Sequence, residues 1–182
     1  MPHLGLLMRS PNGEAIVTDL PAPQPFMVSH GEGSAYQFQA AHGTFPALGT
    51  QTAGRFCVIE RIVPAGYTII PHMHHLEDEA FWMLNGQASF QAGDKVMEAS
   101  AGAFVYLPRD IMHSIKIAES GPAHMLVLVV PAGLEHYLED LAAYREQSGP
   151  PDLATVAAIA AKYQITMPVP SGRQLAPGHL PH

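Results

Sequence analysis

The sequence predicts an all-β barrel or sandwich of short strands, followed by a small helical extension at the C-terminus. Three observations predict this fold class. Between Ala35 and Pro131, short apolar runs alternate with polar residues and turn residues, as half-buried strands do. Asn85-Gly86 lies between two of these runs, and this dipeptide is the strongest short hairpin signal. After Pro131 the apolar spacing changes to that of helices.

The strands are predicted from the period of two that a pleated backbone imposes. Tyr36, Phe38 and Ala40 alternate with two glutamines, and Phe56, Val58 and Ile62 alternate along the run RFCVIERIV. Turns at Asn85-Gly86 and Gly93-Asp94 predict two consecutive hairpins. Three further apolar runs, at 103–107, 114–118 and 124–130, complete a set of about nine or ten strands, enough to close a barrel or sandwich.

Two helices are predicted after the strands. The first carries apolar residues at helical spacing and ends at the SGPP of residues 148–151; these residues are Leu134, Tyr137, Leu138, Leu141 and Tyr144. Asp152 is the predicted cap of the second helix, whose apolar stripe contains Leu153, Val156, Ile159 and Tyr163. The helical pair is interpreted as structural cover on the barrel wall, because it lacks the basic exposed positions of a DNA-reading motif. An irregular tail is expected from Met167.

These patterns divide the chain into three parts. Residues 1–34 form a proline-rich arm, residues 35–131 form the barrel, and residues 132–182 form the helical hairpin and tail. The prolines of the arm favour extended backbone. Such an arm either stays loose or lies across a partner subunit as an added strand, which would cover a sheet edge.

Composition narrows the function classes. The chain has 182 residues, 47% of them apolar and 14% charged, which is typical of one globular domain. A net charge of −7 argues against binding to nucleic acid, which requires a basic face. The longest apolar run, 125–130, is too short for a membrane span, and no secretory signal is recognised at the N-terminus. The single cysteine, Cys57, indicates a buried thiol and a cytoplasmic location.

Chemistry-bearing residues are concentrated in the stretch PAGYTIIPHMHHLEDEAFWMLNG. His72 and His74 are two apart on a predicted strand, so their imidazoles share one face, which is the interior if Ile70 also points inward. Glu79 begins the next strand after a short turn, from which its carboxylate can reach the two imidazoles. His113 begins a later strand after the turn at Pro108. Three imidazoles and one carboxylate form a donor set for a divalent transition metal.

Alternatives to this ligand set remain open. Eleven histidines are enough for one H-x-H pair to arise by chance. His75 must point to the face opposite His74, so a polar role on the outer face, or one that supports the site, is expected for it. Glu77 and Asp78 could replace Glu79 as the carboxylate, although turn residues are expected at these positions. The scattered methionines are interpreted as core or pocket lining rather than as copper ligands.

These residues resemble the motifs of the cupin family. The first cupin motif, G-x5-H-x-H-x4-E-x6-G, is matched in full by Gly66, His72, His74, Glu79 and Gly86. The second, G-x5-P-x-G-x2-H-x3-N, is matched by Gly102, Pro108 and His113, whereas Asp110 replaces its second glycine and Ile117 its asparagine. The resemblance covers residues of about 35 to 131. It implies a double-stranded β-helix, or jelly-roll, barrel that holds a metal through His72, His74, Glu79 and His113.

Within the cupins, the layout of arm, barrel and helical tail is similar to that of bacterial proteins grouped with quercetin 2,3-dioxygenases. The runs EDEAFWMLNG and PAG at 131–133 support this subgroup. The resemblance implies a metal-dependent dioxygenase that cleaves flavonol-like or other enolic, often aromatic, small molecules. Glu79 would then also accept the substrate proton. The fold alone does not choose among cupin activities, so a metal-dependent isomerase or lyase, or a non-catalytic binding protein, remains an alternative.

The cofactor and the oligomeric state are predicted only in outline. One divalent transition metal is expected, and iron, manganese, nickel, cobalt, copper and zinc all suit the donor set. A homodimer is expected, because the arm and the open barrel edges need cover and because two-fold dimers are the commonest oligomers.

Overall fold

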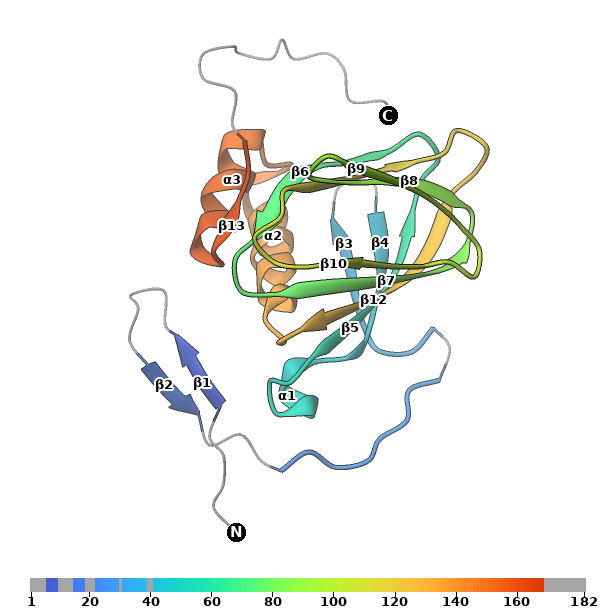
Figure 1. Ribbon diagram of the computed structural model, residues 1–182. Coiled ribbons are helices and arrows are strands. Elements are labelled where there is room, and N and C mark those ends of the chain that lie inside the picture. Colours follow the sequence, from blue (N-terminus) through green and yellow to red (C-terminus); the bar gives the residue numbers. More distant parts are fainter. Residues whose placement is uncertain (1–5, 10–14, 19–21, 30, 39–40, 169–182) are drawn as a thin grey trace.

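The computed structural model describes residues 6–9, 15–18, 22–29, 31–38 and 41–168. Two antiparallel sheets face each other and form a barrel (Figure 1). The six-stranded sheet has the order β10 (Phe104–Leu107), β7 (Asp78–Asn85), β12 (Ala123–Val130), β5 (Cys57–Val63), β4 (Ala41–Ala47) and β3 (Ser34–Phe38). The five-stranded sheet has the order β13 (Ile165–Thr166), β6 (Thr68–His74), β11 (His113–Ile117), β8 (Gln87–Ala92) and β9 (Lys95–Ser100). A separate pair consists of β1 (Leu6–Arg9) and β2 (Ala15–Thr18).

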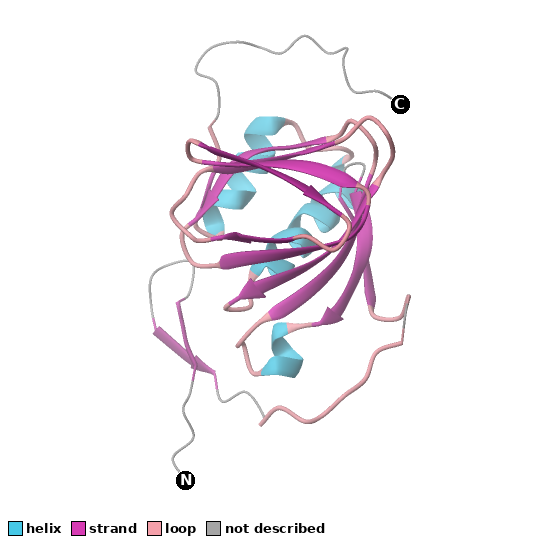
Figure 2. Cartoon of the chain, turned by 45° about the vertical axis from the view of Figure 1, so that its right-hand side comes forward, coloured by secondary structure: helices cyan, strands magenta, loops and turns pink. Residues whose placement is uncertain are grey.

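The hydrophobic core lies between the two sheets. Phe81 of β7 and Phe90 of β8 come from opposite sheets, and their ring centroids are 5.2 Å apart. Both rings are buried, as are Met83 and Met125 beside them in the core. This arrangement confirms the predicted fold class, a jelly-roll barrel with a small C-terminal helical extension (Figure 2).

The turn at Asn85-Gly86 joins β7 to β8, but the predicted hairpin there is wrong. β7 pairs with β10 and β12, whereas β8 pairs with β9 and β11, so this turn carries the chain from one sheet to the other. Gly86 has φ +80°, and a side chain there would collide with the backbone of Pro122 and Ala123. The second predicted hairpin, β8 to β9 through Gly93-Asp94, is confirmed. A dipeptide predicts a turn, but not which strands pair on either side of it.

β5 presents the opposite face to the one that the alternation of Phe56, Val58 and Ile62 indicated. Its fully buried residues are Cys57, Ile59 and Val63, with exposures of 0%, 2% and 0%. β5 lies inside the sheet between β4 and β12. It carries apolar residues on both faces, besides Glu60 and Arg61, so its period is ambiguous in the sequence. Strand β4 and the short helix α1 (Gly49–Thr52) were not predicted. Ala40 lies outside the described residues.

The two predicted helices are α2 (Leu134–Ser148) and α3 (Leu153–Lys162). Asp152 caps α3, because its carboxylate accepts the Thr155 N–H at 2.7 Å. β13 was not predicted; it pairs with β6, with Ile165 opposite His74. The C-terminal segment thereby closes one side of the barrel next to a histidine strand (Figure 1). The tail predicted from Met167 is described only to residue 168, and the boundaries at 34 and 131 remain predictions.

No helix in the described ranges combines the length and the apolar character that a membrane crossing requires.

Candidate metal centre

Two neighbouring strands of the five-stranded sheet position the three histidines. His72 and His74 end β6, His113 begins β11, and His113 pairs directly with His72. The β6–β11 register is irregular between this pair and the next one, Ile115 with Ile69. As a result Ile69 packs against the core, and Ile70, the residue expected to mark the inner face, is 37% exposed. The irregularity shifts the alternation just before His72, as a bulge does.

Glu79 comes from the facing sheet. It is the second residue of β7 and lies opposite Leu107 of β10. Its Oε2 is 3.2 Å from His113 Nε2 and 3.6 Å from His74 Nε2, and His113 Nε2 is 3.2 Å from His72 Nε2. The ligand atoms of all four residues lie within 4.8 Å of one another. The structure therefore brings together the four residues that the sequence singled out.

A hydrogen bond at Nδ1 of each histidine ring fixes the direction in which Nε2 points. Nδ1 of His72 lies 2.8 Å from the Ile70 carbonyl, and Nδ1 of His113 lies 2.9 Å from the Ile111 carbonyl. Nδ1 of His74 lies 3.3 Å from a carboxylate oxygen of Glu77. Carbonyl and carboxylate oxygens accept, so each Nδ1 carries a hydrogen, and in a neutral ring Nε2 then presents a lone pair.

Burial and neighbouring charges set the protonation of the cluster. Burial, together with His113, lowers the pKa of His72 to about 3, so this ring is neutral. Burial raises the pKa of Glu79, but the three histidines oppose this and hold it at about 2. Burial also lowers the pKa of His74, whereas Glu79 and Glu77 together raise it above its ordinary value. A carboxylate and neutral imidazoles are the forms that ligate metals.

The donor set fits a metal cation. Nε2 of His72 and Nε2 of His113 face each other at 3.2 Å, and the buried Oε2 of Glu79 has no hydrogen-bond partner. Buried acceptors that converge without a donor repel one another, and a cation among them removes that repulsion. Imidazole and carboxylate ligands suit the divalent transition metals. The cluster can therefore hold a metal ion, whose identity this donor set does not select.

Glu77, which was expected from the sequence to be a turn residue, is a further functional candidate. It is 4% exposed and accepts the Nδ1 hydrogen of His74, so it orients this ring. Its signal in the sequence was a spacing of three residues from His74. Asp78, the other carboxylate considered for the site, instead holds Arg109 through a pair of hydrogen bonds at 2.9 and 3.1 Å. Neither residue replaces Glu79 in the cluster.

His75 points away from the cluster, as strand alternation predicted. Its Nδ1 is 2.6 Å from Asp110, and its Nε2 is 2.8 Å from Thr166 Oγ1. Asp110 occupies the motif position where cupins carry glycine, and its φ of +61° explains that preference. Asp110 maintains the turn in place of glycine, because its N–H donates a hydrogen bond to the His74 carbonyl at 2.8 Å.

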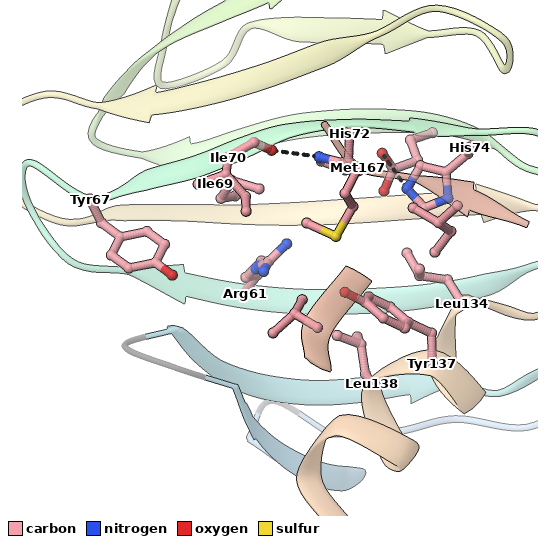
Figure 3. Close-up of a pocket in the computed structure, with 13 residues that line it drawn as sticks. Arg61, Tyr67, Ile69, Ile70, His72, His74, Leu134, Tyr137, Leu138 and Met167 are labelled. Atoms are coloured by element: carbon pink, nitrogen blue, oxygen red, sulfur yellow. Dashed lines mark hydrogen bonds and ion pairs between the residues drawn. The ribbon is translucent and has the colours of Figure 1, made fainter. Parts of the chain in front are cut away.

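A cavity of about 70 Å³ adjoins the cluster, with His72, His74 and Glu79 in its wall. Figure 3 shows the two histidines in this wall. Its opposite wall comes from the C-terminal segment, through Leu134, Tyr137, Leu138, Val156, Ile165 and Met167. The helical pair therefore does more than cover the barrel. Phe104 and Tyr106 of β10 lie on the outer surface, 62% and 53% exposed, and are not part of the cavity wall.

Comparisons with known proteins agree with this fold. Residues 58–129 match the cupin domain family. A quercetin 2,3-dioxygenase from Bacillus subtilis is 27% identical over 128 residues, which are 70% of this chain but 38% of that protein. The match thus spans well under half of that relative's length.

Two solved structures share the fold at low sequence identity. KdgF from a Halomonas species superposes with a TM-score of 0.54 at 15% identity, over 62% of this chain and 98% of that one. The polyketide cyclase RemF from Streptomyces resistomycificus gives 0.51 at 19% identity, over 59% of this chain and 80% of that one. The different names of these relatives show that the fold does not by itself choose a reaction. The barrel and the motif residues agree with the cupin domain match over residues 58–129, and the chain resembles the Bacillus quercetin 2,3-dioxygenase.

Proposed function

We propose that this protein is a metal-dependent dioxygenase acting on an enolic small molecule. The observation that carries the proposal is the convergence of three imidazole nitrogens and one unpartnered carboxylate oxygen at the wall of a cavity. The similarity to a quercetin 2,3-dioxygenase supports the oxygen-dependent reaction and an aromatic enol such as a flavonol as its substrate. His72, His74, Glu79 and His113 are the proposed ligands.

A redox-active divalent metal at this site would bind an enol oxygen of the substrate, lower its pKa and supply the one-electron steps that dioxygen requires. The net reaction breaks the enol C=C bond and the O–O bond, and places one oxygen atom on each carbon. Both oxygen atoms of O₂ enter the products, so no further reductant is needed.

Glu79 is the proposed proton acceptor as well as a ligand. Its Oε2 lacks a hydrogen-bond partner and lies 3.2 Å from His113 Nε2, so it is the free acceptor that a hydroxyl group entering the cluster would meet. His72 and His113 are held by backbone carbonyls and keep their orientation while Glu79 exchanges the proton. The apolar wall of α2 and α3 excludes water from the reacting enolate.

The size of the cavity favours a second candidate, a metal-dependent isomerase or lyase for a smaller substrate. A cavity of about 70 Å³ is well below the several hundred Å³ of typical ligand pockets. A flavonol would enter only if the wall formed by α2, α3 and Met167 moved outward. Oxygen consumption separates the two candidates, because an isomerase or lyase uses none. A binding protein would show neither oxygen consumption nor turnover.

The test begins with metal content. Metal-free protein is incubated with each of the six candidate ions, and the bound metal is measured by mass spectrometry. We expect about one equivalent per chain in the wild type. His113→Ala should lose it, and His42→Ala, which changes an exposed histidine outside the cluster, should keep it. Full metal occupancy in the His113 variant would contradict the proposed ligand.

The loaded protein is then supplied with quercetin and with acetylacetone in an oxygen electrode. Oxygen uptake with either enol, absent in the His113 variant, is the result expected for a dioxygenase. Turnover without oxygen uptake would replace that proposal with the isomerase or lyase. A metal-loaded protein that converts neither compound would contradict catalysis on enols of these two types.

A homodimer is also proposed, and an apolar sheet face supports it. Trp82, Phe104 and Tyr106 are 53%, 62% and 53% exposed on the outer surface of β7 and β10. Phe104 pairs with Trp82 across the strands, and β10 is the edge of its sheet. A two-fold axis would place this face of one copy against the same face of another. The arm of residues 1–34 and a cytoplasmic location remain predictions.

A further inference from the structure

Arg61 occupies an interior position of the barrel. It lies on β5 between Ile59 and Val63, the strand neighbours on its own face, which are 2% and 0% exposed. Across the sheet it pairs with Met125 of β12, which is fully buried. An arginine in such a row of apolar residues is unusual, because arginine is rarely buried without a partner.

The guanidinium of Arg61 has no partner within the described part of the chain. Its Nε is buried without a hydrogen bond, and none of the ion pairs between described residues includes it. A partly desolvated cation with five N–H donors is costly to leave unpaired. Residues that carry such a cost are expected where a ligand supplies the missing partner.

Two phenols share the cavity with this cation. In Figure 3 the hydroxyl groups of Tyr67 and Tyr137 point toward the Arg61 guanidinium. Burial raises the pKa of both tyrosines, that of Tyr137 to about 12, although Arg61 opposes the shift. Both phenols are therefore neutral and able to donate. The chain thus gathers a cation and neutral O–H donors at one end of the cavity, a combination that recognises an anion.

The same cavity connects Arg61 to the metal cluster. Its wall includes Arg61 as well as His72, His74 and Glu79. In Figure 3 the thioether of Met167 lies between His72 and Arg61. A ligand that displaces this flexible side chain could meet the metal at one end and the guanidinium at the other.

We propose that Arg61 binds a carboxylate of the substrate, so that the substrate is a small enolisable carboxylic acid. This inference rests on the proposed function and names the substrate class of the same site. The planar guanidinium matches a carboxylate with two parallel hydrogen bonds. The small volume of the cavity excludes a large acid unless the wall moves. An uncharged flavonol would leave the guanidinium unpaired in the bound state.

The experiment compares acetopyruvate with acetylacetone, two enolic diketones that differ by a carboxylate in place of a methyl group. Binding to the zinc-loaded full chain is measured by isothermal titration calorimetry. Zinc has no redox chemistry, so the result does not depend on whether the protein uses oxygen. We expect acetopyruvate to bind the wild type about tenfold more tightly or better, as a charge-assisted pair of hydrogen bonds would provide.

Arg61→Met should weaken the binding of acetopyruvate by about tenfold or more and change that of acetylacetone by less than about twofold. Arg55→Met is the matched control, because it removes the same charge from an exposed loop position. Metal content and a melting curve show whether the Arg61 variant is loaded and folded. If the Arg61→Met protein is not folded or not loaded, Arg61→Lys is used instead, which keeps the charge but loses the planar pair of N–H donors. It should weaken the binding of acetopyruvate by an intermediate amount and leave that of acetylacetone unchanged.

Two results would overturn the proposal. One is wild-type protein that binds acetopyruvate no more tightly than acetylacetone, or not at all. The other is an Arg61 variant that weakens both compounds equally. The proposed dioxygenase activity can fail independently. If the protein binds the acid more tightly through Arg61 but consumes no oxygen, the role of Arg61 stands and the dioxygenase activity is refuted.

Discussion

Replacing Glu77 should weaken metal binding without removing any ligand. Glu77 accepts the Nδ1 hydrogen of His74, with 3.3 Å between the two atoms. This contact holds the ring so that Nε2 faces Glu79 and the two other histidines. In Glu77→Ala, the His74 ring loses both its preferred tautomer and its orientation, and part of the energy of metal binding is spent on restoring them.

The expected size of the effect follows from the burial of the pair. His74 and Glu77 are 2% and 4% exposed, so water does not replace the lost acceptor. Changes at residues that support metal ligands weaken affinity by about 10- to 100-fold, which corresponds to about 1.4 to 2.7 kcal/mol. Glu77→Gln keeps an amide oxygen that can accept the same hydrogen, so we expect it to stay within about threefold of the wild type.

Metal affinity is measured by competition with a zinc chelator, at one pH and one ionic strength. Glu98→Ala is the control, because it removes a carboxylate from an exposed position on β9. A Glu77→Ala protein that retains wild-type affinity would refute the assigned role. The same holds if Glu98→Ala is equally harmful, since the effect would then come from net charge.

Two further predictions concern stability and assembly. The Thr155 N–H lowers the pKa of Asp152, so the cap stabilises the fold fully above a pH of about 4 and loses its effect as the pH falls through the lowered pKa. Asp152→Ala should therefore lower the melting temperature by a few degrees at neutral pH and by less in acid. The melting temperature of Asp152→Asn should stay close to that of the wild type. An equal loss for Asp152→Ala at both pH values would contradict the assigned role of the cap. Trp82→Glu should convert the proposed dimer into monomers, as measured by sedimentation velocity. Val96→Glu is the control, because it changes an exposed position on β9 and should leave the dimer intact. A wild-type protein that is a monomer would refute the dimer.

The candidate ligands were accessible to sequence reasoning because they depend on local geometry. His72 and His74 share a face through the period of two along one strand, and Glu79 follows after a short turn. His113 is remote in the sequence, and its place came from the family resemblance together with the turn at Pro108. The helices were accessible as well, since Asp152 and the apolar spacing of α2 and α3 are local signals.

Which strands pair, and which face of a strand points into the barrel, were harder to predict from the sequence. The dipeptide Asn85-Gly86 indicated a turn, yet only the fold shows that its two strands belong to different sheets. β5 carries apolar residues on both faces, which left its inner face ambiguous, and the assignment of that face to Phe56, Val58 and Ile62 was wrong. That error hid Arg61, which lies on the same face as Cys57 and Ile59 and so in the barrel interior.

The sequence by itself determined the fold class, the turns and the four residues of the candidate metal centre, because strand period, turn chemistry and motif spacing act over short stretches. The tertiary structure decided that Glu77 supports His74, that Arg61 shares a cavity with the cluster, and that α2, α3 and β13 form the cavity wall. These are contacts between segments that only packing brings together, since nothing local specifies which face of a doubly apolar strand becomes the interior.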